Sequence, residues 1–253
     1  MTTELCCNGN MMTETDLKSD SVARALFQRR AIRAFEPAEI PPATRDALLQ
    51  AARHAPSSFN MQPYRIYWVE SAAQRTAVAR LCFSQGPAQT ASALIVAVAD
   101  LGSLRSTARL QAAWMRQAGF PEAKVREYEL TARLGRMIFA PGPLNVFGAA
   151  KWALFRLVHV FKSLGLPPVT RRDLLKWAGK STALACQNFM IAAEMVGLST
   201  CPMEGFDGPR LARYLGLSKH QEIVMIIALG KKPPAYMAQP QWRRPLETTV
   251  AIL

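Results

Sequence analysis

The chain has 253 residues, half of them apolar, which is enough for one large domain with a substantial core. Its five cysteines are odd in number and lack the paired spacing of a zinc site, so we expect a reducing compartment and assign no metal. The formal charge of +13 is concentrated between residues 101 and 180, where fourteen Lys and Arg face four Asp and Glu, a net of +10. Such a segment suits an anionic membrane surface or an acidic substrate, whereas nucleic acid is a partner that we do not expect.

Residues 1–20 carry acidic side chains and no apolar run after a basic start, which argues against a signal peptide. We expect a disordered tail here, followed by a single domain over residues 21–253, in a cytoplasmic protein. Residues 21–28 have the apolar spacing of a helix, and three prolines soon follow them. Residues 45–53 are predicted to form a short amphipathic helix with Thr44 as its N-cap.

Short runs of β-branched and aromatic residues predict buried strands at residues 64–70 and 91–99, and the spacing of residues 72–82 predicts a helix between them. A third strand is predicted at residues 221–229, after an apolar helix at residues 181–196. Strands that alternate with helices favour an α/β layer architecture, in which helices cover a sheet.

Residues 101–177 are mostly helical by pattern and are predicted to form a basic helical insertion in the domain. Within them, residues 144–166 are long and apolar enough to suggest a membrane span, but three cationic side chains and a histidine interrupt the run. On a helix these four lie within about 140° of arc, so the segment is amphipathic rather than membrane-spanning. A lid over an active site and a peripheral contact with the inner membrane surface are both open interpretations of the insertion.

Three polar motifs stand out. Residues 29–33 hold three arginines, and the planar fork of a guanidinium matches the oxygens of a phosphate. Residues 56–63 form a loop of small hydroxyl and amide side chains between two prolines, and residues 201–207 read Cys-Pro-Met-Glu-Gly-Phe-Asp. In this order the motifs resemble the nitroreductase family of FMN-dependent oxidoreductases, and the resemblance covers residues 20–100 and 177–250.

The resemblance implies an α/β (α+β) fold with a mixed central sheet flanked by helices and an extended C-terminal tail. It also implies a homodimer with two FMN sites where its subunits meet. The implied activity is hydride transfer from NADH or NADPH to a small electrophilic acceptor, such as a nitroaromatic, a quinone or an activated alkene, by a ping-pong mechanism.

The resemblance further assigns roles to residues. Arg29 would meet the FMN phosphate, and Arg33 would lie near the pyrimidine edge of the flavin, where a cation stabilises the charge of the reduced ring. The loop at 56–62 would reach FMN from the partner subunit, and the backbone at Glu204 and Gly205 would address the ring edge. The full set implied to bind FMN is Arg29, Arg30, Ala31, Arg33, Pro56, Ser57, Ser58, Asn60, Gln62, Pro202, Met203, Glu204, Gly205, Arg243 and Arg244.

Two departures from the family pattern matter. Ala31 replaces a frequent hydroxyl, which removes one expected phosphate donor. Ser84, Gln85 and Pro87 stand where the family often carries an amide and a second cation near the ring. No residue resembles a nucleophile activated by a base, so we assign no catalytic side chain and expect the cofactor to carry the chemistry.

Two alternatives remain open from the sequence. The first keeps the flavin but changes the reaction, to reductive dehalogenation or to flavin breakdown. The second is a membrane-surface binding protein with a vestigial flavin site and a lipid contact through residues 144–166.

Overall fold

The structure, a computed structural model, describes residues 21–139 and 170–253. Residues 1–20, predicted to be a disordered tail, and residues 144–166, predicted to be an amphipathic helix, lie outside these ranges. The division into tail, single domain and insertion stays a prediction, as does the cytoplasmic location. No helix in the described ranges is both long and apolar enough to cross a membrane.

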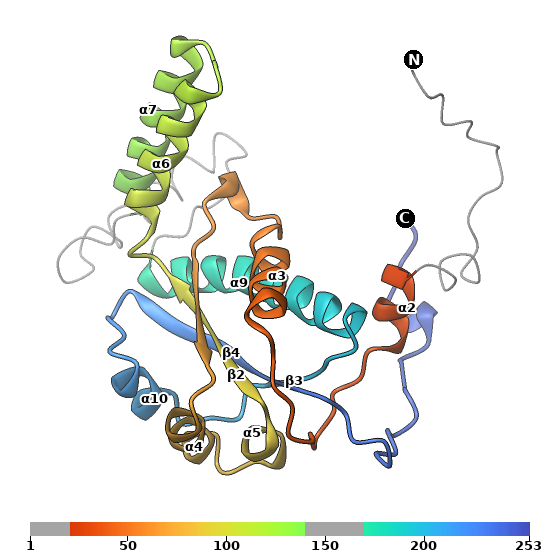
Figure 1. Cartoon of the computed structure of the whole chain (residues 1–253). Coiled ribbons are helices and arrows are strands. Elements are labelled where there is room, and N and C mark those ends of the chain that lie inside the picture. The colour runs from red at the N-terminus through yellow and green to blue at the C-terminus, as the bar shows by residue number, and fades with distance from the viewer. Residues whose placement is uncertain (1–20, 140–169) are drawn as a thin grey trace.

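Helices precede, separate and follow the strands along the chain, as Figure 1 shows. The helices are α2 (Ser21–Gln28), α3 (Pro42–Arg53), α4 (Ala72–Leu81), α5 (Gly86–Thr90), α6 (Leu104–Gln117), α7 (Glu122–Phe139), α9 (Arg171–Met195) and α10 (Gly208–Tyr214), with short 3-10 turns η1 (Ser58–Asn60) and η3 (Leu246–Thr248). The strands are β1 (Tyr64–Val69), β2 (Ala93–Asp100), β3 (Ser199–Met203) and β4 (Gln221–Gly230).

The four strands form one sheet in the order β1-β2-β4-β3, with β1 and β3 at its edges. Every strand pair in this sheet is antiparallel, and the parallel contact that the described residues contain is an isolated bridge between Ala31 and Thr200. The α+β class with helices around a central sheet is therefore confirmed. The predicted mixture of strand directions is limited to that bridge.

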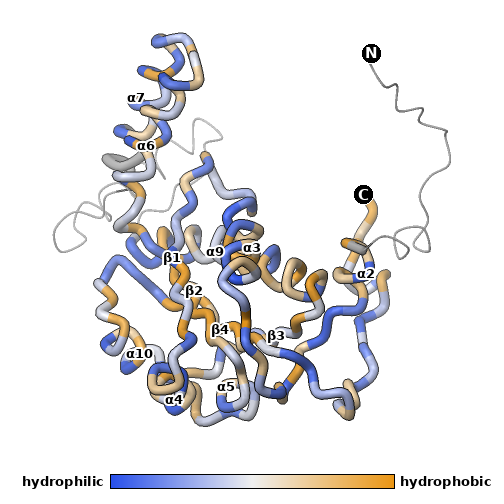
Figure 2. Tube along the Cα trace, in the orientation of Figure 1, coloured by the Kyte–Doolittle hydropathy of each residue, from blue (hydrophilic) through white to orange (hydrophobic). Residues whose placement is uncertain are grey.

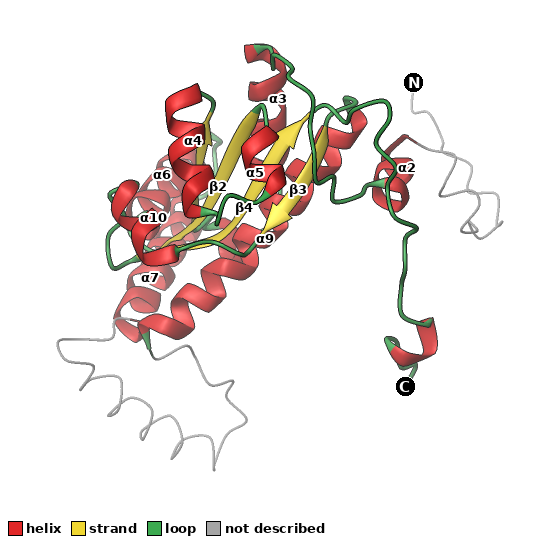
Figure 3. Ribbon diagram, turned by 90° about the horizontal axis from the view of Figure 1, so that it is seen from below, coloured by secondary structure: helices red, strands yellow, loops and turns green. Residues whose placement is uncertain are grey.

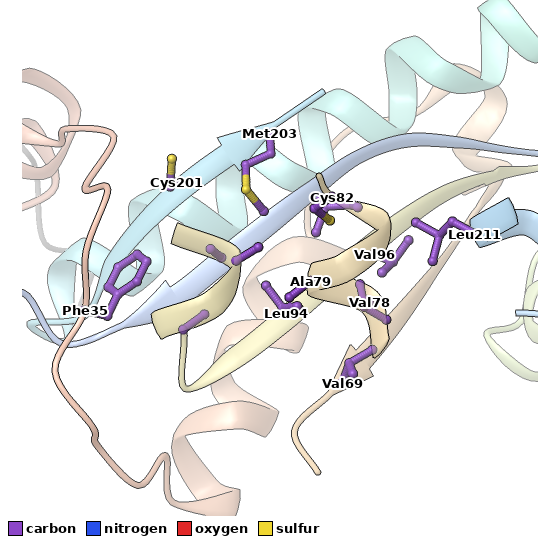
Figure 4. Packing of buried hydrophobic residues seen from close by; sticks show 14 of the residues in the cluster. Phe35, Val69, Val78, Ala79, Cys82, Leu94, Val96, Cys201, Met203 and Leu211 are labelled. Atoms are coloured by element: carbon purple, nitrogen blue, oxygen red, sulfur yellow. The ribbon is translucent and has the colours of Figure 1, made fainter. Parts of the chain in front are cut away.

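Helices cover both faces of the sheet, and each face has its own apolar core (Figures 1 and 3). All eight residues of β2 are buried, as expected for a strand that is covered on both sides. Leu94 and Val96 face α4, α5 and α10, whereas Ile95 and Ala97 face α3 and α9. Figure 4 shows the first of these cores, and Figure 2 shows the hydrophobic residues concentrated along the strands.

The helices α6 and α7 pack against each other and project away from the sheet (Figure 1). They occupy residues 104–139 of the predicted basic insertion, and its residues 171–177 form the start of α9. Arg116 of α6 bonds Glu122 at 3.3 Å and Glu129 at 3.0 Å, both on α7, and Ala112 and Val125 are buried. The pair is therefore a helical hairpin held by both apolar and ionic contacts.

Three predictions about local structure were wrong. The strand β3 was missed because Pro202 lies inside it, and proline lacks the N–H that a ladder needs; the strand is tolerated because it is an edge strand. The helix α3 begins at Pro42, two residues before Thr44, since proline suits the first helical position. The helix predicted at 181–196 begins ten residues earlier, at a capping box formed by Thr170 and Asp173.

Candidate active site

The arginine stretch follows α2 and runs beside the edge strand β3. The amide of Ile32 donates to the carbonyl of Thr200 at 3.0 Å, and Ile32 and Phe35 are buried. The amide of Arg33 donates to the hydroxyl of Tyr236 at 3.1 Å. The backbone is thus fixed from both sides, while the side chains of Ala31 and Arg33 remain exposed.

The neighbouring arginines have different environments. Arg30 donates from Nη1 to the carbonyls of Phe27 and Gln28, the latter at 2.8 Å, so it caps the C-terminus of α2. Arg29 is half-buried, and its Nη1 atom is buried without a hydrogen-bond partner among the described residues. Buried donors are normally paired, so Arg29 offers a free donor where an anion could bind.

A carboxyl group lies close to these cations. Glu194, in the last turn of α9, is half-buried, and this burial raises its pKa above the ordinary value. Arg29, Lys232 and Arg30 act in the opposite direction. Glu194 and Lys232 were not predicted from the sequence, although an acidic residue at the end of an otherwise apolar helix was a visible signal.

The end of β3 meets the turn before α5. Gln85 donates from Nε2 to the carbonyl of Gly205 at 2.6 Å, and a Cβ added at Gly205 would lie 3.1 Å from the same Nε2. A Cβ added at Gly86 would lie 3.2 Å from the carbonyl of Arg33. The structure therefore brings together the arginine stretch, the turn at residues 84–86 and the segment that follows β3.

Four predicted site residues belong to this last segment. Met203 is buried and Pro202 is half-buried, so they anchor it to the sheet, whereas Glu204 and Gly205 are exposed. Gln85 supplies an amide at this turn, while Pro87 is buried at the start of α5 and offers no cation. Arg33 lies beside this turn through its backbone carbonyl, and Arg80 lines a hollow next to Ser84 on the α4 side.

The thiol of Cys201 lies near the same arginines. Burial raises its pKa, while Arg33 and Arg29 act to lower it. Because burial is the largest effect, the sulfur stays a protonated thiol at neutral pH rather than a reactive thiolate. The geometry thus offers no nucleophile at this place.

The loop at residues 56–62 has an unusual backbone. Phe59, Asn60 and Gln62 adopt the left-handed region with φ of 55°, 52° and 45°. The amide of Gln62 donates to Ser57 Oγ at 3.0 Å, and Gln62 Nε2 donates to Asn60 Oδ1 at 3.1 Å. Left-handed residues other than glycine are strained and cluster at functional sites. Pro56 and Ser58 are exposed beside them.

This loop and the arginine stretch lie at opposite corners of the sheet. The loop leads into β1 and the arginines lie along β3, so three strand-to-strand steps, about 14 Å, separate them across the sheet. They are also displaced along the strand direction. Tyr64 pairs with Ala99, which pairs with Glu222 of β4, whereas Thr200 pairs with Leu229 of the same strand. The seven residues from 222 to 229 correspond to roughly 23 Å. Figure 1 shows the same separation between η1 and the segment after α2. One chain does not bring these two motifs together.

The late arginines lie on the extended tail. Both are exposed, and they bond nearby carbonyls: Arg243 donates to Trp242 at 2.8 Å and Arg244 donates to Thr248 at 3.0 Å. No described hydrogen bond joins them to the arginine stretch. Tyr236, earlier in the same tail, does contact Arg33, and no sequence signal marked it.

The residues present fit FMN. A phosphate needs cationic donors, which the unpaired Nη1 of Arg29 provides. A planar ring needs a backbone that it can approach closely, which the exposed Gly205 provides. Thr200 pairs with Ala31, the position where the family frequently has a hydroxyl. The hydroxyl of Thr200 is buried and has no hydrogen-bond partner among the described residues.

Comparison with known proteins agrees with this geometry. A relative named NADH dehydrogenase, from Thermus thermophilus, is 28% identical over 226 residues, which cover 89% of this chain and 93% of the relative. The 4-nitrobenzoate reductase of Pseudomonas putida is 26% identical over 220 residues, 85% of this chain and 86% of that protein.

A solved structure from Exiguobacterium sibiricum, in complex with FMN, superimposes with a TM-score of 0.68 at 21% identity, and the match covers 90% of this chain and 95% of that one. The sequence model of the nitroreductase family matches residues 26–231. The chain therefore belongs to the nitroreductase family and is an oxidoreductase that uses FMN with NAD(P)H.

Proposed function

We propose that this protein transfers hydride from NADH or NADPH to a small electrophilic acceptor, a nitroaromatic, a quinone or an activated alkene, in a ping-pong cycle. The observation that carries the proposal is that Arg29, Arg33, Gln85 and Gly205 all lie along the β3 edge of the sheet. Bound FMN supplies the hydride chemistry, and the protein supplies binding, orientation and charge.

Each of these residues has a separate task. Arg29, with its free guanidinium donor, holds the phosphate. Arg33 places a fixed cation near the pyrimidine edge, where negative charge develops during reduction. The carbonyl of Gly205 is occupied by Gln85, so the exposed backbone at Glu204 and Gly205 is oriented before the cofactor arrives.

The second half of the site comes from a partner subunit. The loop at 56–62 has the polar groups that suit the ribityl chain and ring edge, but it lies at the far corner of its own sheet. A homodimer brings the two parts together because the arginine stretch of one copy can face the loop at residues 56–62 of the other copy. The tail supports a partner as well, since its large apolar side chains are exposed one after another, at Met237, Trp242, Leu246 and Ile252.

The acceptor is proposed from the hairpin and the comparisons. Exposed Trp114 gives α6 an aromatic surface that could stack on a flat acceptor, which favours the lid over the membrane anchor. Contact with a membrane through residues 144–166 remains a prediction about residues outside the described ranges. The relative named for 4-nitrobenzoate supports a nitroaromatic among the acceptors.

A spectroscopic assay tests the proposal. The purified protein is expected to show the absorbance of oxidised flavin, to lose it anaerobically on addition of NADH or NADPH, and to regain it with a nitroaromatic, a quinone or an enone. Product analysis with halogenated phenols, and flavin recovery after exposure to oxygen, separate dehalogenation and flavin breakdown from this activity. Colourless protein that does not bind added FMN would refute the proposal.

A further inference from the structure

The α6–α7 hairpin touches the strained loop. The hydroxyl of Tyr128, on α7, donates to Gln111 Oε1 on α6 at 2.9 Å and lies 3.7 Å from the sulfur of Met61 in the loop. A hydroxyl has one proton, which goes to the nearer amide oxygen, so the sulfur makes a packing contact with the phenol. Met61, Gln111 and Tyr128 are all half-buried, so this contact is partly shielded from solvent.

The loop needs support from outside. Its described hydrogen bonds are local: the amide of Asn60 donates to Ser57, that of Met61 to Ser58, and that of Gln62 to Ser57 Oγ. Left-handed backbone at three positions is unfavourable and persists where the surroundings hold it. In the described residues, the side chain of Tyr128 on α7 contacts this loop from another element, at Met61.

The hairpin can supply that support because it is itself braced. Tyr128 lies one helical turn after the buried Val125, on the face of α7 that meets α6. Arg116 holds the other flank through Glu122 and Glu129. The phenol is therefore fixed on a paired-helix support before it contacts Met61, and burial also raises its pKa, so it stays a protonated donor.

We infer that Tyr128 is a positioning residue, which acts through Gln111 and Met61 to hold the loop at residues 57–62 in the conformation that presents Ser57, Asn60 and Gln62 to FMN. The inference rests on the proposed function for the identity of the ligand, but the brace itself is a property of the free chain. It connects the insertion to the cofactor site, because whatever moves the hairpin also moves the flavin loop.

Hydrogen exchange of the apoprotein tests the brace directly. The variants Tyr128→Ala and Met61→Ala should each raise the exchange rate of the amides of residues 60–62 about tenfold, and Tyr128→Phe, which keeps the ring, about threefold. The double variant Tyr128→Ala with Met61→Ala should be no faster than either single variant, since both remove one contact. Arg109→Gln, at an exposed position on α6, and Tyr214→Phe, on α10, are controls that should leave the loop within twofold of wild type.

FMN affinity of the same variants gives the second readout. The dissociation constant should rise about tenfold for either alanine variant and about threefold for Tyr128→Phe, again without addition in the double variant. Additive effects, an unchanged exchange rate, or an equal loss in Arg109→Gln would overturn the inference. If Tyr128→Ala does not fold, Tyr128→Phe and Met61→Ala still decide it. Wild-type protein that binds no FMN would defeat the proposed function, while the exchange experiment would still test the brace.

Discussion

The side chain of Gln85 donates a hydrogen bond of 2.6 Å to the carbonyl of Gly205, although the two residues are 120 positions apart in the chain. This bond joins the turn before α5 to the segment after β3, directly beside the carbonyl of Arg33. It fixes the exposed backbone that we propose for the flavin ring.

Gly205→Ala should weaken FMN binding about three- to tenfold. The new methyl group would lie 3.1 Å from Gln85 Nε2, so the amide must move by a few tenths of an ångström and its bond to residue 205 is weakened. Fluorescence titration of the apoprotein with FMN measures the effect. Gly179→Ala is the matched control, because its methyl group would come no closer than 3.9 Å to Val224 and alanine favours the interior of α9. Equal affinity in Gly205→Ala and wild type would contradict the assigned role.

Arg29→Gln should raise the dissociation constant of FMN by roughly ten- to a hundredfold, since a charge-assisted bond to phosphate contributes about 1.5–3 kcal/mol. Riboflavin, which lacks the phosphate, should bind the variant and the wild type alike. Arg30→Gln is the control, because Arg30 caps α2 and should affect the stability of that helix more than cofactor affinity. A loss of riboflavin affinity equal to that of FMN would exclude a phosphate role for Arg29.

Arg33→Gln should make the flavin harder to reduce. Removal of a nearby cation destabilises the reduced ring, and the midpoint potential is expected to fall by roughly 30 mV or more, which for two electrons corresponds to about 1.4 kcal/mol. Spectroelectrochemical titration measures this potential, with Arg24→Gln, an exposed arginine in α2, as the control. An unchanged potential in a variant that still binds FMN would place Arg33 away from the ring.

Glu194→Gln should both stabilise the fold and tighten FMN binding at neutral pH. Burial raises the pKa of Glu194, so its contribution to stability is fully present below the pKa of the unfolded chain and is lost as pH rises through the folded value. The gain from glutamine is at most about 1 kcal/mol at pH 7, because the carboxyl is half-exposed and screened, and it should vanish near pH 4. Thermal unfolding at both pH values checks this, and a variant that is less stable at pH 7 would contradict it.

Most of the sheet could be predicted from the sequence because β1, β2 and β4 are runs of β-branched and aromatic residues with a strong local signal. The strand β3 could not, because its five residues include a proline and its pairing depends on β4, which is distant in sequence. Strand pairing of this kind is a tertiary property, and local propensity does not contain it.

The candidate site shows the same division. The three motifs were recognisable because guanidinium, hydroxyl and amide groups are chemically distinctive at those spacings. Their arrangement was not, since the contacts of Gln85 with Gly205 and of Tyr236 with Arg33 join segments far apart in the chain. The half-buried Glu194 became meaningful only once α9 was seen to end beside the arginines.

Subunit complementation tests most directly whether FMN lies between the arginine stretch of one subunit and the loop of the other. One variant carries Arg29→Gln and Arg33→Gln, the other carries Ser57→Ala, Asn60→Ala and Gln62→Ala, and the two are co-expressed with different tags so that heterodimers can be isolated. Each homodimer should lose FMN, whereas the heterodimer should regain one FMN per dimer, because one of its two sites combines an intact arginine stretch with an intact loop. A heterodimer that remains without FMN, while wild-type protein prepared in the same way is loaded, would contradict a site shared between two chains.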